Sequence, residues 1–518
     1  MMSILQNILP IFIILAVISF VIWMLPKVEI THTKEFEARR RINWITLGLS
    51  YAFLYFGRYN LSIAKTGLEK MGLLDNQIFG NLISIGAVVY GCSIVINAPL
   101  CDKFGGRKTL MIASLGASIA NLLMGLCVVF HDQIPVNLSV SLGVLYAINM
   151  YFQSFGAVSI VKVNSAWFHV RERGMIGGIF GTLIALGFYF GLDWNRLILE
   201  NFGVNYVFLI PSGVLFIMFC LDILIIRDSP KAAGFEDLNT GDATSDDNGP
   251  RMSVIQVFKK LLTNPIIVTI AFIELCSGYI RESIIQWGPT VATSLPSQSD
   301  SFIFKNWGMV NCCAGILSGI IAGIISDHVF KSRRGPVAAI LYSGLFVFCT
   351  ILFFVLDNYL FGVTFVCMVL CIVGVHGMLS GTASMDFGGS KNAGIATGLI
   401  DGFVYIGGAI SGQVMGHYLP SGEAAAIPQN WITWPTCLMP AIVIGLILST
   451  RIWNATVQNS KKPNSSKEPK PDEEKDQTEE TDQTEETDQT EENDQTEETS
   501  QTEETDQTAG SDPEPAGA

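Results

Sequence analysis

The sequence predicts an all-α, multi-pass membrane protein in which one extra N-terminal helix precedes two pseudo-symmetric six-helix bundles and a disordered acidic tail. Of the 518 residues, 49% are hydrophobic and only 15% are charged, which is typical of chains that cross a bilayer several times. Apolar stretches long enough to span follow one another along most of the chain. Basic residues gather in alternate loops between these stretches, so that they share one side of the membrane.

The first element is an apolar stretch at 4–25, which is long enough to span a bilayer. Its positive residues, Lys27 and Arg39 among them, follow the stretch rather than precede it, and no small-residue cleavage site comes after it. A signal peptide has a different arrangement, with its positive charge first. We therefore expect 1–26 to remain as an extra transmembrane helix whose first residue lies outside the cytoplasm.

Two bundles of six spans follow, separated by a polar central loop. The first bundle, 43–226, contains the spans 43–66, 78–100, 109–130, 138–161, 174–193 and 205–226. The second bundle, 263–451, contains the spans 264–287, 307–326, 337–356, 360–383, 393–417 and 431–450. The loop 227–262 is rich in Asp, Gly, Ser and Asn, and we expect it to be cytoplasmic. Two matching halves with a site between them at the membrane midplane are typical of secondary transporters.

The last segment, 452–518, is dominated by the acidic repeat DQTEET. A segment of this composition cannot form a hydrophobic core, so we expect it to be disordered and cytoplasmic. The formal net charge of −14 comes from this tail, and the membrane part is nearly neutral. The tail is also a candidate contact for a cytoplasmic partner.

The stretch YAFLYFGRYNLSIAK carries a charge in the middle of the first span of the bundles. At a rise of about 1.5 Å per residue, a span that begins at Trp44 places Arg58 well inside a hydrocarbon core of about 30 Å. A guanidinium at that depth faces a bundle interior or a wet cavity. Helical spacing puts further polar side chains on the same stripe: Tyr51, Tyr55, Ser62 and Lys65. This stripe predicts a site for a polar anion, whereas the alternative is an arginine that only holds helices together through a buried carboxylate.

Arg281 occupies a matching depth in the seventh span, when that span is counted from Ile266. Two arginines from opposite halves can close bidentate forks on a phosphate group. Glu274 and Glu282 lie near Arg281 in the sequence, and either can pair with it when the site is empty. A structural ion pair is the alternative.

Other polar residues lie at membrane depth. In the eleventh span, Asp401 and Tyr405 share a stripe, and Asp401 is suited to binding a sugar hydroxyl, pairing with a lysine or carrying a proton; the sequence leaves these three roles open. His376 in the tenth span either contacts the ligand or makes a hydrogen bond between helices. Lys162, near the end of the fourth span, either contributes to the site or extends to the cytoplasmic surface.

Two cytoplasmic loops carry an acidic residue followed by basic ones. The loop DKFGGRK contains Asp102 and Arg107, and the loop DHVFKSRRG contains Asp327, Arg333 and Arg334. Because the pattern occurs once in each half at matching offsets, we predict that these residues gate transport by latching the halves in one state. The alternative is an ordinary pair of positive-inside loops.

Other classes of function find no support in the sequence. No stretch resembles a nucleotide-binding loop, which argues against a primary pump. The 11 cysteines are scattered, and their spacing matches neither a metal site nor a disulfide framework. We expect no enzymatic activity, no cofactor, no metal and no nucleic-acid partner.

Several motifs together resemble one known family. Tyr51, Tyr55 and Arg58 match the tyrosines and the phosphate-binding arginine of its first helix, and Arg281 with QWGPT matches its seventh helix. Further matches are Lys162 and Trp167 with RERG, the segments DWNRLILENFGVNYVFLIP, RDSPKAAGF and DHVFKSRRG, Asp386 with KNAG, Tyr405 with IGG, and Asp401 with Gly402. Over residues 40–451 the chain thus resembles the major facilitator superfamily and, within it, the organophosphate:phosphate antiporters.

This resemblance implies a major facilitator fold and an inner-membrane antiporter that exchanges a sugar phosphate or glycerol 3-phosphate for inorganic phosphate. Together, the resemblance and the side-chain patterns select these substrate-binding residues: Arg58, Arg281, Tyr51, Tyr55, Lys65, Lys162, Tyr405, Asp401 and His376. The chain departs from the bacterial glycerol-phosphate carriers at Tyr59, Leu183 and Gly374, where those carriers have a lysine, a histidine and a tyrosine. The leading helix and the acidic repeats are also absent from that family.

Two other functions remain open at this point. A membrane sensor of external sugar phosphate would share the arginine pair with the transporters. A proton-coupled symporter of another organic anion would use Asp401 or Glu274 as its proton carrier. For the antiporter, we expect a monomer in the lipid bilayer whose ligands are phosphate and phosphate esters.

Overall fold

The computed structural model describes residues 2–24, 33–133, 135–169, 181–183, 185–236, 261–330, 333–383 and 393–455, together with residues 238, 256 and 259. These residues lie within one compact unit, Met1–Pro463. Every regular element that they form is a helix, so the predicted all-α class is confirmed. Most of the predicted acidic tail and much of the central loop lie outside the described residues.

The first bundle contains the expected six spans, two of which consist of several helical pieces. Its elements are α2 (Lys34–Phe56), α3 (Asn60–Lys70), α4 (Asn76–Phe104), α5 (Gly106–Val129), α6 (Leu138–Trp167), η2 (Tyr189–Trp194), α8 (Asn195–Phe202) and α9 (Tyr206–Ile225). A short turn of helix, η3 (Lys231–Ala233), follows at the start of the central loop. Of the predicted fifth span, 174–193, residues 181–183 and 185–193 are described and helical, and the helix continues through α8; the rest of that span lies outside the described residues.

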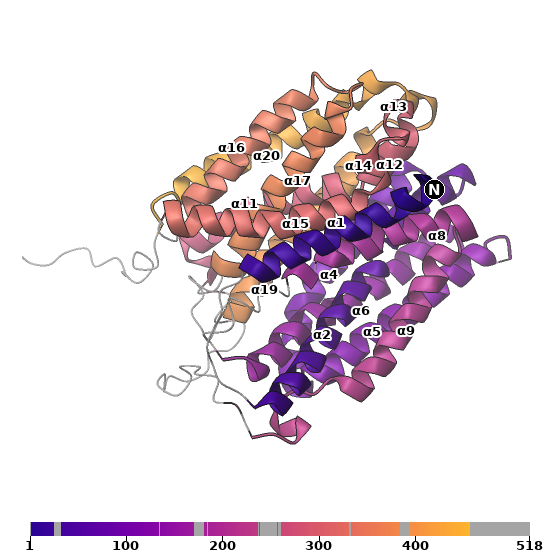
Figure 1. The fold of residues 1–518 in the computed structure, drawn as a ribbon. Helices are drawn as coiled ribbons and strands as arrows, with labels where there is room; N and C mark the ends of the chain where they lie inside the picture. Colours follow the sequence, from indigo (N-terminus) through magenta and orange to yellow (C-terminus); the bar gives the residue numbers. More distant parts are fainter. Residues whose placement is uncertain are drawn as a thin grey trace, which may run out of the picture. The chain divides into compact units, whose positions relative to one another are not determined.

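The second bundle repeats this plan (Figure 1). Its main elements are α11 (Pro265–Ile285), α12 (Gly288–Ser294), α15 (Trp307–Ile324), η5 (Ile325–Val329), α16 (Arg334–Leu352), α17 (Leu360–His376), η6 (Gly377–Ala383), α19 (Ala393–Tyr418) and α20 (Thr433–Arg451). The connections contain α13 (Pro296–Ser299), α14 (Phe302–Lys305), η7 (Gly422–Ala426) and η8 (Pro428–Ile432). The predicted spans therefore correspond to observed helices, with differences of a few residues at most ends.

Among the described residues, eight helices are long and apolar enough to cross a membrane. The helix α11 is not one of them, because Glu274, Arg281 and Glu282 interrupt its apolar sequence. A helix that carries three charged side chains is tolerated at membrane depth only where other helices surround those charges. The charged residues of α11 therefore mark the inside of the bundle.

The first span of each bundle is broken, which the sequence analysis did not predict. In the first bundle, α2 ends at Phe56 and α3 begins at Asn60. In the second, α11 ends at Ile285 and α12 begins at Gly288. Pro289 explains the second break, because proline lacks the N–H that a continuous helix requires and its ring clashes with the preceding turn.

Asparagine and tryptophan side chains satisfy the carbonyl groups that these breaks expose. In the first bundle, Asn149 Nδ2 donates to the carbonyl of Gly57 at 2.8 Å, and Asn195 Nδ2 donates to the carbonyl of Phe56 at 2.9 Å. In the second bundle, Trp307 Nε1 donates to the carbonyl of Ile285 at 3.2 Å. Irregular backbone at membrane depth needs such partners, because lipid supplies none.

Close contact between backbones joins the two bundles along α4 and α19. A Cβ added to Gly80 would lie only 2.3 Å from the carbonyl oxygen of Gly412, so the helices meet where neither has a side chain. Further contacts lie between η2 and α15 and between α3 and α12. Small residues allow this close helix packing in membranes, where the hydrophobic effect does not hold helices together.

Hydrogen bonds between the bundles gather at the end where α4 begins and α19 ends, which we call the outer end. Asn76 Nδ2 donates to the carbonyl of Pro420 at 3.0 Å, and Ser84 Oγ donates to the carbonyl of Ala409 at 2.7 Å. The carboxylate of Asp193 accepts hydrogen bonds from the backbone N–H groups of Gly308 and Met309, at 2.7 and 2.8 Å. The structure is thus closed at the outer end, and the positive-inside pattern predicts that this end faces away from the cytoplasm.

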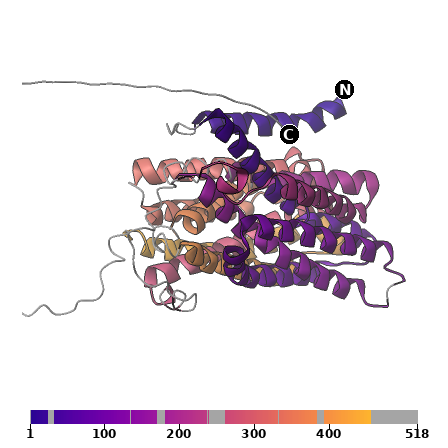
Figure 2. The same ribbon diagram turned by 90° about the horizontal axis from the view of Figure 1, so that it is seen from below.

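The extra helix α1 (Met2–Met24) packs on α15 of the second bundle. Figure 2 shows this N-terminal helix on the outside of the two bundles. Its residue Ile14 is only 4% exposed, so one side of α1 is in contact with protein. Retention of this helix in the mature protein stays a prediction.

We expect the mature protein to keep its N-terminal residues. The reason is the packing of α1 on α15 and the lack of a cleavage signal in the sequence that follows. N-terminal sequencing, or mass spectrometry of the protein purified from membranes, measures this directly. A mature chain that began near Val28 would contradict the prediction.

Candidate functional site

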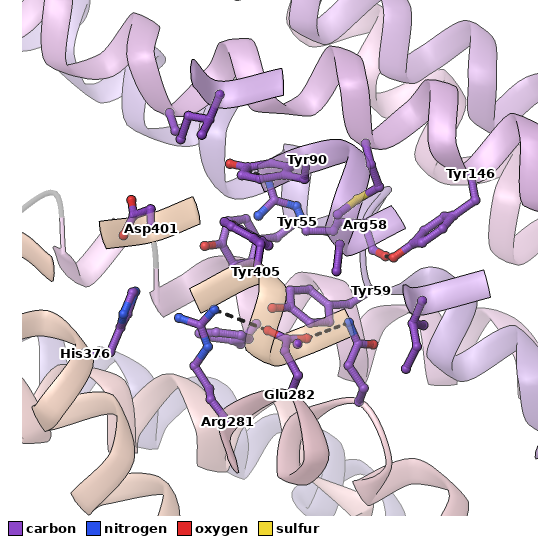
Figure 3. A pocket seen from close by; sticks show the side chains of 18 of the residues that line it. Tyr55, Arg58, Tyr59, Tyr90, Tyr146, Arg281, Glu282, His376, Asp401 and Tyr405 are labelled. Carbon is purple, nitrogen blue, oxygen red and sulfur yellow. Dashed lines mark hydrogen bonds and ion pairs between the residues drawn. The ribbon is translucent and has the colours of Figure 1, made fainter. Parts of the chain in front are cut away.

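A polar cavity of about 180 Å³ lies between the two bundles. Its lining combines many phenols with a few charged side chains, as Figure 3 shows. The polar lining residues of the first bundle are Tyr51, Tyr55, Arg58, Tyr59, Tyr90 and Tyr146, and those of the second are Arg281, Glu282, Gln286, His376, Asp401 and Tyr405. The cavity thus brings together Arg58 and Arg281, which lie in opposite halves of the chain.

Arg58 lies in the break between α2 and α3 and is held from several sides. Its Nε donates to Gln153 Oε1 at 2.9 Å, and its Nη2 donates to the hydroxyl of Tyr90 at 3.3 Å. Its guanidinium carbon lies 4.7 and 4.6 Å from the ring centres of Tyr55 and Tyr90, within the range of cation–π interaction. Arginine has five N–H donors, so donors remain for an anionic ligand.

Arg281 on α11 is the second cation of the cavity. Its Nη2 lies 3.3 Å from Glu282 Oε1, and Glu282 Oε2 accepts a hydrogen bond from Gln286 Nε2 at 3.1 Å. The Nε of Arg281 is buried and has no hydrogen-bond partner among the described residues. A buried N–H without a partner is unfavourable, so this donor is suited to a ligand oxygen. Of the two glutamates considered from the sequence, Glu282 is the one that pairs with Arg281.

Glu274 pairs with His376 instead. The carboxylate of Glu274 is completely buried, and its Oε2 lies 3.0 Å from His376 Nδ1. Ser380 Oγ donates a hydrogen bond to Asp401 Oδ1. His376 and Asp401 both line the cavity, as does Tyr405, whose ring centre lies 4.3 Å from that of Tyr90. These contacts place the predicted residues of the tenth and eleventh spans beside the arginine pair.

Two predicted substrate-binding lysines do not line this cavity. Lys65 is fully buried and pairs with Glu69 at 2.8 Å, one helical turn further along. The prediction assumed one continuous helix, whereas α2 ends at Phe56 and α3 begins at Asn60. Lys162 lies near the C-terminal end of α6, where its Nζ is 2.7 Å from Asp102 Oδ1. In this structure both lysines are therefore partners in ion pairs rather than lining residues.

Arg107 contacts the first bundle and the start of the central loop, and Arg333 and Arg334 make contacts within the second bundle. The backbone N–H of Arg107 donates to Asp228 Oδ1 at 2.7 Å, and its Nη2 donates to the carbonyl of Ile223 at 2.5 Å. In the second bundle, Arg333 Nε donates to the carbonyl of Phe330 at 3.3 Å, and Arg334 Nη1 donates to Ser326 Oγ at 2.7 Å. The side chain of Asp327 lies outside the described residues. A latch between the halves remains a prediction.

We expect Asp102→Asn to slow transport more than it weakens substrate binding. Asp102 does not line the cavity, and its pair with Lys162 is exposed, at 71% and 43% of the two side chains. Exposed pairs contribute about 0–1 kcal/mol, so the fold should tolerate the change. Transport rate and apparent affinity, measured on the same reconstituted protein, test the prediction. An unchanged rate at normal affinity would remove Asp102 from the gate.

The sequence analysis missed several residues that shape the site. Tyr90, Tyr146 and Gln153 come from α4 and α6, and nothing in their own stretches indicates that they meet Arg58. A glutamine inside the apolar sequence of α6 was the one available signal, because a buried amide needs a partner. Tyr59 lines the cavity one helical turn after Tyr55, with the two ring centres 5.5 Å apart, so its spacing from Tyr55 was a second signal.

No group of three or more His, Cys, Asp or Glu side chains in the described part of the chain is arranged to hold a metal ion. The cavity instead offers guanidiniums, phenols and carboxylates. This arrangement can bind an oxyanion through the arginines and can bind hydroxyl groups through the carboxylates and phenols.

Comparison with known proteins gives related transporters. The chain is 25% identical over 442 residues to the glycerol-3-phosphate transporter of Bacillus subtilis (strain 168), covering 79% of this chain and 91% of that one. It is 24% identical to a probable hexose phosphate transport protein of Chlamydia trachomatis, covering 83% and 94%. It is also 24% identical to the membrane sensor protein UhpC of Salmonella typhimurium, covering 74% and 87%.

The fold is also that of solved transporters. A bacterial homologue of the human lysosomal transporter Spinster, solved in an inward-facing and unoccupied conformation, matches with a TM-score of 0.61 at 11% identity, covering 83% of this chain and 98% of that one. The sequence profile of the Major Facilitator Superfamily matches residues 47–412. That match covers most of both bundles, and the chain therefore belongs to the major facilitator superfamily of membrane transporters.

Proposed function

We propose that this protein exchanges an organophosphate, either a sugar phosphate or glycerol 3-phosphate, for inorganic phosphate by alternating access. The observation that carries the proposal is the presence of Arg58 and Arg281, one from each half, in a single cavity. Phosphate esters carry between one and two negative charges near neutral pH. A pair of permanently charged guanidiniums compensates such an anion without proton uptake.

The same arginine pair accounts for exchange rather than net flow. When the cavity is empty, the charge of Arg281 is offset by Glu282, whereas the described hydrogen-bond partners of the Arg58 side chain, Gln153 and Tyr90, are neutral. Closing a low-dielectric cavity around an uncompensated charge is unfavourable. A bound phosphate removes this cost, so each reorientation of the two halves should require a bound phosphate or phosphate ester.

The relatives support the substrate class. The relatives from Bacillus subtilis and Chlamydia trachomatis are named as transporters of glycerol 3-phosphate and of hexose phosphate, and both esters contain a phosphate and hydroxyl groups. The proposed location is the inner membrane, with the acidic tail in the cytoplasm and the protein acting as a monomer. The domain boundaries 1–26, 43–226, 227–262, 263–451 and 452–518 belong to the same proposal.

Counterflow in proteoliposomes tests this function. The purified protein is reconstituted into two sets of vesicles, one loaded with unlabelled phosphate and one without phosphate. Entry of labelled phosphate is then followed in both sets. We expect rapid entry only when phosphate or a phosphate ester is present on both sides. Uptake that needs a proton gradient and no internal phosphate would instead support the symporter.

A sensor of external sugar phosphate is the second candidate. It is favoured by the relative from Salmonella typhimurium that is named a membrane sensor protein, whose identity to this chain is similar to that of the transporters. The two candidates differ in turnover. A sensor would bind phosphate esters in the purified state but would show little counterflow.

A further inference from the structure

The cavity has two chemically different ends. At one end, the guanidinium of Arg58 lies over the rings of Tyr55 and Tyr90. At the other end, Figure 3 shows Asp401 and His376 on the same side of the pocket, separated from Arg58 by Tyr405. We call Asp401, His376 and Glu274, the partner of His376, the acidic end.

Among the described residues at the acidic end, each positive or ionisable nitrogen group already has a carboxylate partner. The imidazole of His376 lies 3.0 Å from the buried carboxylate of Glu274, so any positive charge on the ring is offset within the protein. Asp401 adds a second carboxyl group that lines the cavity. The guanidinium of Arg281 already has Glu282 beside it, at 3.3 Å. A second negative group on the ligand would therefore meet carboxylates, and every cation described beside them already has a carboxylate partner.

The acidic end does offer free hydrogen-bonding atoms. Ser380 donates to Oδ1 of Asp401, and Oδ2 has no partner among the described residues. His376 uses Nδ1 for Glu274, which leaves Nε2 without a protein partner in the part of the chain that the structure describes. A carboxylate oxygen accepts a hydrogen bond from a hydroxyl group. These atoms are therefore suited to the hydroxyls of an uncharged organic group.

We propose that the acidic end sets substrate class: it admits phosphate esters whose organic group is uncharged and carries hydroxyls, and it rejects those that carry a carboxylate. This inference rests on the proposed binding of phosphate by Arg58 and Arg281. With the phosphate held by the arginines, the organic group extends to Asp401 and His376. A ligand carboxylate there lies against Asp401 as a like charge in a poorly solvated cavity, which is strongly unfavourable. Rejection by charge is an effective source of specificity.

Glycerol 3-phosphate and 3-phosphoglycerate form a matched pair of probes. They share the phosphate and the middle hydroxyl, and they differ only in a terminal hydroxymethyl group that is a carboxylate in 3-phosphoglycerate. Binding of each to the purified full-length protein is measured by the thermal shift that the ester produces over a range of concentrations. We expect glycerol 3-phosphate to bind at least about tenfold more tightly, which corresponds to about 1.4 kcal/mol.

The variant Asp401→Asn tests which residue causes the difference. Asparagine keeps the shape of the side chain, removes the negative charge and supplies an N–H donor that suits a carboxylate. We expect the affinities of this variant for glycerol 3-phosphate and 3-phosphoglycerate to differ by no more than about threefold, or less than about 1 kcal/mol. The readout is the ratio of the two affinities, because a general loss of folding or of phosphate binding would change both affinities together. Asp222→Asn is the matched control, since Asp222 is a buried carboxyl bonded to Ser50 and Ser114 and does not line the cavity.

Two results would overturn the inference. One is equal or tighter binding of 3-phosphoglycerate to the unmodified protein, which requires no variant to fold. The other is an Asp401→Asn protein that prefers glycerol 3-phosphate over 3-phosphoglycerate as strongly as the unmodified protein and Asp222→Asn do. A failure of the proposed function is distinguishable: the affinity ratio would still hold, but proteoliposomes would show no counterflow of phosphate.

Discussion

Arg58→Lys and Arg281→Lys are each expected to weaken phosphate binding by about 100-fold, which corresponds to about 2.7 kcal/mol. Both substitutions keep the positive charge, so a purely electrostatic site would tolerate them. A guanidinium, however, presents parallel N–H groups that bind two phosphate oxygens at once, whereas an ammonium group acts as a compact point charge. Hydrogen bonds to charged groups contribute about 1.5–3 kcal/mol each, so the loss of one fork accounts for the expected effect.

The surroundings of Arg58 make its replacement still less tolerable. Its Nε donates to Gln153, and its planar group lies against the rings of Tyr55 and Tyr90. A lysine cannot donate from the same position or present the same flat face, so the amide oxygen of Gln153 loses its donor. We therefore expect Arg58→Lys to have an effect at least as large as Arg281→Lys.

Arg196→Lys is the matched control for both variants. Arg196 makes an ion pair with Glu200 at 2.6 Å on α8 and does not line the central cavity. Phosphate binding, measured by thermal shift, should be unchanged in this control. Normal binding in Arg58→Lys or Arg281→Lys would show that the site has been assigned to the wrong residues.

Asp193→Ala is expected to reduce the maximal exchange rate at least about tenfold, because it destabilises the outer-closed state by more than about 1.4 kcal/mol. Asp193 belongs to the first bundle, is only 5% exposed and accepts two backbone hydrogen bonds from the start of α15 in the second bundle. Each buried N–H left without a partner costs about 1–3 kcal/mol. The outer-closed state would lose this energy, and the state with separated ends would gain population.

Gly308→Ala tests the same contact without removing a charge. A Cβ on Gly308 would lie 2.7 Å from the carbonyl oxygen of Phe188 and 2.9 Å from the backbone nitrogen of Asp193. Backbone atoms cannot move aside as a flexible side chain can, so η2 and α15 must separate. Like Asp193→Ala, this variant is expected to lower the exchange rate more than the apparent phosphate affinity, since neither residue lines the central cavity.

Gly319→Ala provides the control on the same helix. Nothing lies within 4 Å of a Cβ added to Gly319, so this variant adds the same methyl group to α15 without a clash. We expect it to exchange phosphate at the rate of the unmodified protein. If Asp193→Ala and Gly308→Ala also kept that rate, the contact between η2 and α15 would not limit transport.

The fold and the arginine pair were predictable because their signals are local or repeated. An apolar run of about 20 residues is enough to identify a span, and the chain has such runs in two similar groups. Arg58 and Arg281 stand out because a charge in an apolar run has few roles at membrane depth. Their presence in one cavity follows from the symmetry of the two halves.

The details of the site depend on contacts between distant helices, which the sequence does not reveal. At the break beside Arg58, Asn149 and Asn195 from other helices donate hydrogen bonds to the exposed carbonyls of Gly57 and Phe56. The stripe expected to run on to Lys65 assumed a continuous helix, and a role of Lys65 in substrate binding stays a prediction. Tyr90 likewise meets Arg58 only through the way in which α4 packs against the first span.

The glycine contact between α4 and α19 has a consequence for how transport responds to temperature. Where Gly80 meets Gly412, the approach is so close that a methyl group would not fit, so neither glycine contributes a rotatable side chain. The side chains that face Gly412 are those of Ile83 and Ser84. A separation of these surfaces therefore frees few rotamers, and the change in side-chain entropy is small. At this contact, the balance between the closed and separated states is therefore expected to be governed by enthalpy, through a few hydrogen bonds such as the one from Ser84 to Ala409.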